Sequence, residues 1–153
     1  MNKKIFTIFL IFLSVVSCGF TPVALYKENL NINVNILDYE GDYQVNSALR
    51  SKLSVHKNNE SNKEYEIVIK TKYEKNDLSK DASGNIENYQ LMASTTFEIS
   101  KRDAVTNTIT FSEKFTMENF SDDFQEESYE KEIKENFAES IYNKFISHIL
   151  QDQ

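Results

Sequence analysis

The sequence contains very few of the residues on which small exported domains and many active sites depend. It has one cysteine, so no disulfide can form within the chain and an apolar core must stabilise the fold. Neither of the two histidines has the spacing to Cys, Asp or Glu that a zinc site requires. Three glycines and one proline argue against a loop-rich scaffold, and no phosphate loop or nucleophile elbow occurs.

Basic residues are also scarce, with 17 Lys and Arg against 24 Asp and Glu, for a formal net charge of −7. An acidic protein without a basic stripe is a poor candidate for binding nucleic acid. The carboxylate-rich run 122–135 is typical of a solvated helix start rather than of paired catalytic acids, and no serine has a recognisable base. We therefore expect no enzyme activity, no cofactor and no metal ion.

The one long hydrophobic run lies at the start of the sequence. Lys3 and Lys4 precede the apolar stretch Ile5–Val16, and this order predicts a signal peptide over residues 1–17. The stretch is too short for a transmembrane helix, which needs about 20 apolar residues. An aliphatic residue, a small residue and then Cys18 resemble a bacterial lipobox, which implies that the Cys18 thiol carries the lipid.

After the signal peptide, we expect a lipid-anchored segment over residues 18–29 and a single domain over residues 30–153. Loss of Lys3 and Lys4 would take the formal charge from −7 to −9. The 11 Phe and 8 Tyr supply large side chains for a core. Each contributes on the order of 1.5–3 kcal/mol when it is fully buried.

Four segments alternate between apolar and polar residues, as half-buried strands do. They are Leu30–Ile36, Tyr65–Glu74, Tyr89–Ser100 and Thr108–Met117, with Glu113 as the one charged residue on an apolar face. Glu40-Gly41-Asp42 is expected to end the first strand. The polar residues 76–85 are expected to form a turn-rich connection between two antiparallel strands.

Two segments have helical periodicity instead. The first is Tyr43–Val55, and the second begins at Asp123, which has capping-box spacing to Glu126, and runs for about 26 residues. The second helix has a continuous apolar stripe, made by Tyr129, Ile133, Phe137, Ala138, Ile141, Phe145 and Ile149. The predicted fold is α+β, a two-layer sandwich in the order β-α-β-β-β-α. One mainly antiparallel four-stranded sheet carries both helices on one face.

Four basic residues are candidates for contact with a phosphorylated lipid. Lys70 and Lys72 share the polar face of one predicted strand, and Lys101 and Arg102 end the next. Pairing of these strands would bring the four onto one edge or face, where their charge suits phosphate. Scattered solubilising charge is the simpler interpretation of the same residues.

Cys18-Gly19-Phe20-Thr21-Pro22-Val23 resembles the start of the LptE family, the LPS-assembly lipoproteins of Gram-negative outer membranes, and particularly its alphaproteobacterial members. The predicted element order and the long terminal helix agree with that family. The resemblance implies a protein on the periplasmic side of the outer membrane, anchored in the inner leaflet. Gly19 is consistent with outer-membrane sorting, since the Asp that signals inner-membrane retention is absent.

The resemblance further implies that the protein plugs the lumen of the LptD β-barrel, helps the barrel to fold and assists insertion of lipopolysaccharide (LPS) into the outer leaflet. LptD and LPS are then its expected partners. Two alternatives remain open. One is an outer-membrane lipoprotein that binds another periplasmic partner, such as a transporter accessory subunit. The other is a hydrolase that uses surface carboxylates.

Overall fold

The computed structural model describes residues 32–57, 61, 63–101 and 107–151. Its elements are β1 (Asn33–Gly41), α2 (Tyr43–Leu53), the short 3-10 helix η2 (Ser54–His56), β2 (Glu64–Lys80), β3 (Ile86–Lys101), β4 (Asn107–Glu118) and α3 (Asp123–Gln151). This is the predicted β-α-β-β-β-α order. The expected signal peptide, Cys18, the segment 18–29 and Arg102 lie outside the described residues.

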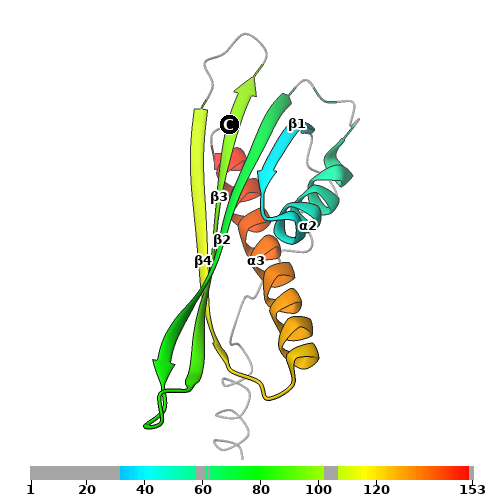
Figure 1. The fold of residues 1–153 in the computed structure, drawn as a ribbon. Coiled ribbons are helices and arrows are strands. Elements are labelled where there is room, and N and C mark those ends of the chain that lie inside the picture. Colours follow the sequence, from blue (N-terminus) through cyan, green and yellow to red (C-terminus); the bar gives the residue numbers. More distant parts are fainter. Residues whose placement is uncertain (1–31, 58–60, 62, 102–106, 152–153) are drawn as a thin grey trace, which may run out of the picture. The chain divides into compact units, whose positions relative to one another are not determined.

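The four strands form one sheet in the order β1-β2-β3-β4. β1 is parallel to β2, and the other two pairs are antiparallel. A parallel pair needs a crossover connection, and α2 provides it. Helices α2 and α3 lie on the same side of the sheet (Figure 1). The prediction of a two-layer α+β fold with a mainly antiparallel sheet is therefore confirmed.

The core lies between the sheet and the two helices. Alternate residues of the strands point into it because successive side chains of a strand face opposite sides. Phe97 of β3 and Phe145 of α3 are fully buried and stack with their ring centroids 4.2 Å apart. The predicted stripe of α3 is buried from Ile133 to Ile149, whereas Tyr129 is 36% exposed.

Glu113, the charged residue on an apolar strand face, is explained by its partners on α3. The Ser140 hydroxyl donates a hydrogen bond to Glu113 Oε1 over 2.6 Å, and Lys144 Nζ lies 2.6 Å from the same oxygen. The carboxylate therefore points toward the helix, as the alternation requires. Its charge is neutralised there instead of being left unpaired beside the core.

The hairpin between β2 and β3 is longer than the sequence predicts. β2 continues to Lys80 and β3 begins at Ile86, so only residues 81–85 form the connection. Asp81 accepts hydrogen bonds from the backbone N–H groups of Ser83 and Asn85, and Gly84 has a φ of +86°. The added strand residues are mostly polar, and their pairing depends on backbone hydrogen bonds that leave no apolar pattern in the sequence.

β1 ends at Gly41, within the predicted break Glu40-Gly41-Asp42, and so extends past the alternating segment that ends at Ile36. Its register with β2 shifts between Ile36 and Asp38, so Leu37 forms a bulge and is 56% exposed. Gly41 has a φ of +97°, and a Cβ there would lie 1.8 Å from the Thr71 carbonyl oxygen. Only glycine fits this close approach between the end of β1 and β2.

The residue that caps α3 is Asp122, one residue before the predicted capping residue, Asp123. Asp122 Oδ1 accepts a hydrogen bond from the Gln125 backbone N–H over 2.9 Å. Glu126 Oε2 accepts one from the Phe120 backbone N–H over 3.2 Å. Asp123 is thus the first helical residue, and the helix has 29 residues instead of about 26.

Candidate functional site

The side of the sheet that faces away from the helices is a polar surface, here called the open face. It includes Lys70 and Lys72 of β2, and the hydroxyl residues Ser94, Thr96, Thr110 and Ser112 of β3 and β4. Ser94 and Ser112 hydrogen-bond across the strands over 2.9 Å, and Thr96 and Thr110 over 2.8 Å. The open face therefore offers water or a polar partner hydroxyl groups that are already ordered.

The two candidate lysines of the open face are held by carboxylates. Lys70 Nζ lies 2.5 Å from Glu98 Oε1, and this hydrogen bond raises the pKa of Lys70. Lys72 Nζ lies 2.5 Å from Glu74 Oε1. Exposed ion pairs of this kind are weak, so a phosphate group can compete for either lysine.

The structure does not place Lys101 with the other two lysines. Lys101 is the partner of Tyr65 in the β2–β3 register, and Tyr65 points into the core. Lys101 is therefore on the helix side of the sheet, with its Nζ 5.3 Å from the centroid of the Tyr65 ring. Of the four predicted basic residues, Lys70 and Lys72 share a face, Lys101 is on the opposite face, and Arg102 lies outside the described residues.

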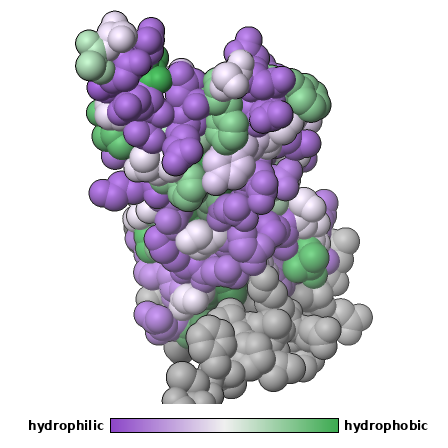
Figure 2. Space-filling model, turned by 90° about the horizontal axis from the view of Figure 1, so that it is seen from below, coloured by the Kyte–Doolittle hydropathy of each residue, from purple (hydrophilic) through white to green (hydrophobic). Residues whose placement is uncertain are grey.

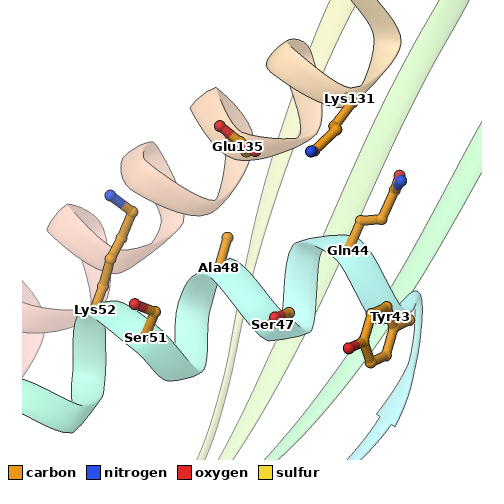
Figure 3. A pocket seen from close by; sticks show the side chains of 8 residues that line it. All are labelled: Tyr43, Gln44, Ser47, Ala48, Ser51, Lys52, Lys131 and Glu135. Atoms are coloured by element: carbon orange, nitrogen blue, oxygen red, sulfur yellow. The ribbon is translucent and has the colours of Figure 1, made fainter. Parts of the chain in front are cut away.

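A groove of about 580 Å³ is lined by residues of α2 and α3. Gln44, Ala48 and Lys52 project from α2 toward α3, and Lys131 projects back from α3 (Figure 3). Small side chains keep the groove open on the α2 side, and Lys52 forms an ion pair with Glu139. The side chains that line the groove include hydroxyls, an amide and charged groups but no histidine. The groove can therefore hydrogen-bond a polar ligand, but it has no histidine to act as a general base.

The carboxylates of the run 122–135 were predicted to be solvated, but two of them, Glu126 and Glu130, form ion pairs with Lys75. Lys75 Nζ lies 2.7 Å from Glu126 and 2.9 Å from Glu130, and the Tyr73 hydroxyl donates to Glu130 over 2.9 Å. Burial raises the pKa of Glu130, but the hydrogen bonds from Lys75 and Tyr73 outweigh it and hold that pKa below its ordinary value. Burial and Glu130 together raise the pKa of Tyr73. These groups attach the first half of α3 to β2.

Each of the two histidines contacts an aromatic side chain of the fold. His56 is buried, and its Nε2 lies 2.8 Å from the Tyr142 hydroxyl of α3. Burial lowers the pKa of His56, which keeps the ring neutral. His148 lies in the last turn of α3, where it is half-buried beside the Phe111 ring. Within the described ranges, no group of three or more His, Cys, Asp or Glu side chains is arranged to hold a metal ion.

The surface feature that the sequence analysis missed is at the end where β4 leads into α3. Phe124 is 77% exposed there and Phe115 is 40% exposed. Their aromatic character is visible in the sequence, but the predicted alternation placed Phe115 in the core. The only signal was the interleaving of Phe and Tyr with a run of acidic residues that contains no Lys or Arg.

α2 and α3 are each too short or too polar to cross a bilayer, and the same holds for every helix in the described residues.

No family model and no curated protein matches the sequence. The fold does match solved structures. Rare lipoprotein B from Shewanella oneidensis has a TM-score of 0.58 at 15% identity, over 78% of this chain and 96% of that one. A putative lipoprotein from Caulobacter crescentus CB15 has a TM-score of 0.54 at 11% identity, over 78% and 92%. At these identities the similarity establishes a common fold.

Proposed function

We propose that this chain is an outer-membrane lipoprotein that assists assembly of an LptD-type β-barrel and insertion of LPS into the outer leaflet, acting as a plug in the barrel. One observation carries the proposal. The domain that follows the lipobox-like Cys18 has the same fold as two solved lipoproteins, over nearly the full length of each. The LptE-like start of the sequence and the fold thus lead to the same class of protein.

The anchor in this proposal is the lipidated Cys18, with its acyl chains in the inner leaflet of the outer membrane. Two or three acyl chains give stable anchoring, at about 0.8 kcal/mol per buried methylene group, whereas one chain gives marginal binding. Gly19 supports transfer to the outer membrane.

The plug in this proposal is the sheet-and-helix domain. The lumen of an outer-membrane barrel is polar and hydrated, so a plug needs a polar exterior on a stable body. The open face meets this requirement through its paired hydroxyls and its lysine–carboxylate pairs. The tip of the β2–β3 hairpin, residues 81–85, projects at one end of the long strands and is the part best placed to reach the barrel wall (Figure 1).

LPS contact belongs to the same proposal. Lys70 and Lys72 are candidates on the open face, and Lys101 is a candidate at the end of β3 on the helix side of the sheet. Arg102 is the fourth candidate and lies outside the described residues. Because Lys70 and Lys72 already pair with Glu98 and Glu74, a phosphate must displace a carboxylate to bind them. Contact through these lysines is therefore expected to weaken as salt is raised.

Depletion of the protein in its own cells tests the proposal. We expect less assembled barrel in the outer membrane and less LPS at the cell surface, and both should return with the wild-type chain. Unchanged barrel assembly and unchanged surface LPS would favour the alternative of a lipoprotein that serves another periplasmic partner.

A further inference from the structure

The end of the molecule where β4 leads into α3 has exposed aromatic side chains. We call it the aromatic end, and it comprises Phe115, Phe120, Phe124 and Tyr129. Tyr129 makes edge contacts with Phe115 and Phe120, with ring centroids 6.3 and 5.5 Å apart. Phe124 is 77% exposed, Phe115 40% and Tyr129 36%. Large aromatic side chains that gather at a surface mark a site of interaction more often than chance exposure does.

The carboxylates of β4 and the first part of α3 fall into two groups. Glu126 and Glu130 pair with Lys75, and Glu113 pairs with Lys144. By contrast, four exposed carboxylates near the rings form no ion pair with any described residue: Glu118, Asp122, Asp123 and Glu127. No Lys or Arg occurs from residue 115 to residue 130, so the sequence supplies no cation locally.

Figure 2 views the molecule from below, the side on which β4 leads into α3 in Figure 1. Hydrophobic side chains appear on this side among a largely hydrophilic surface. The exposed rings of the aromatic end are interspersed in the sequence with exposed carboxylates, so a partner that covers the rings must also satisfy negative charge. Anionic lipid and LPS do not meet that condition, because their phosphates repel the four carboxylates.

We infer that the aromatic end binds a segment of a protein partner that carries arginine side chains. The guanidinium group stacks on aromatic faces and donates bidentate hydrogen bonds to carboxylates, so it satisfies both features of this surface at once. Lysine matches the charge but lacks the planar donor pair. The partner's identity rests on the proposed function, in which it is the barrel protein, whereas the chemistry of the contact rests on this surface alone.

Photo-crosslinking in intact cells tests the inference. A photoreactive phenylalanine analogue replaces Phe124, the most exposed ring, in the full chain, and the crosslinked peptide of the partner is sequenced. A matched pair of variants is then made in this background. One neutralises the aromatic end (Asp122→Asn, Asp123→Asn and Glu127→Gln), and Asn keeps the helix cap at position 122. The other makes the same charge change on exposed carboxylates elsewhere (Glu66→Gln, Glu132→Gln and Glu135→Gln).

The inference predicts a crosslink to a protein, at a peptide with arginine beside the crosslinked residue. Neutralising the aromatic end should lower the yield about tenfold, because several exposed charge pairs are lost together. The control variant should stay within about twofold, and equal urea midpoints of the two variants would show that both remain folded. A crosslink to lipid or LPS, no crosslink, a peptide without arginine, or equal yields from the two variants would overturn the inference.

The outcomes separate this inference from the proposed function. If Ser83 crosslinks to the barrel but Phe124 does not crosslink to an arginine-bearing segment, the proposed function stands and the inference fails. If Phe124 crosslinks to an arginine-bearing segment of a different protein and depletion leaves surface LPS unchanged, the inference stands and the proposed function fails.

Discussion

Asp42 connects the start of α2 to the middle of α3 through Lys134. Its Oδ1 accepts the capping hydrogen bond from the Val45 backbone N–H over 2.9 Å, and its Oδ2 lies 3.2 Å from Lys134 Nζ. Lys134 also stands over the Tyr73 ring, 3.9 Å from its centroid, so its charge is held against the inner side of the sheet. One carboxylate thus stabilises a helix end and compensates a largely buried ammonium group.

We expect Asp42→Ala to lower the free energy of unfolding by about 2–4 kcal/mol, since it removes a helix cap and a partner of Lys134. Asp42→Asn is the matched control, because it keeps a capping oxygen but removes the charge. It should cost clearly less than the alanine variant in urea unfolding. Equal and small losses in both variants would show that neither the cap nor the ion pair matters to the fold.

Phe145→Ala should destabilise the protein by about 3–5 kcal/mol, the usual cost of removing a buried aromatic ring. Phe145 has no exposed surface and stacks on Phe97. Phe124→Ala is the same substitution on the same helix at a site that is 77% exposed, and it should cost less than about 0.5 kcal/mol. Urea midpoints that do not differ between the two variants would contradict the observed docking of α3.

Stability should fall as the pH drops below about 6.5, the ordinary pKa of histidine. Burial lowers the pKa of His56, so the unfolded chain binds a proton there before the folded chain does. The contribution is fully present above the unfolded pKa and is lost as the pH falls toward the lower folded value. The unfolding free energy of His56→Gln should therefore be nearly independent of pH between about 7 and 5.5, where carboxylates still keep their charge. A wild-type protein with the same flat profile would show that His56 is not held neutral by the fold.

In the proposed function, lipidation would depend on the single thiol of the chain, that of Cys18. We expect wild type to be labelled by a fatty-acid analogue in cells, and Cys18→Ala to remain unlabelled and either unprocessed or free in the periplasm, because it has no acyl acceptor. A substitution at a neighbouring position, Thr21→Ala, serves as the control and should be labelled like wild type. Equal labelling of Cys18→Ala would end the lipoprotein interpretation.

The sequence predicts the fold where burial determines the pattern. Ile67 and Ile69 of β2 and Ile133 to Ile149 of α3 follow the expected periods because each has one face in the core. The alternation even identifies Glu113 correctly as inward-facing, and only its partners Ser140 and Lys144 required the structure.

The apolar–polar pattern does not predict the structure where backbone hydrogen bonds and polar contacts determine it. The ends of β2 and β3 pair through backbone groups and polar contacts, such as the hydrogen bond from Asn88 to Ser79, so no apolar period reveals them. The cap of α3 falls on Asp122 instead of Asp123, since two adjacent acidic residues give the same signal. The expected pairing of the two strands groups Lys101 with Lys70 and Lys72. However, side chains two residues apart on a strand point to the same side, so Lys101 follows Phe97 and Ile99 to the inner side of the sheet.

The most direct test of the proposed function is a photo-crosslinker at Ser83, in the exposed turn of the β2–β3 hairpin. In intact cells, a plug inside the LPS-export barrel should give a crosslink from Ser83 to the LptD-type subunit. The same crosslinker at Leu49, which is fully buried in α2, should give none. A crosslink from Ser83 to the LptD-type subunit is the result that the proposal predicts. Its absence in cells that contain both proteins, or capture of a different periplasmic protein in its place, would contradict the proposal.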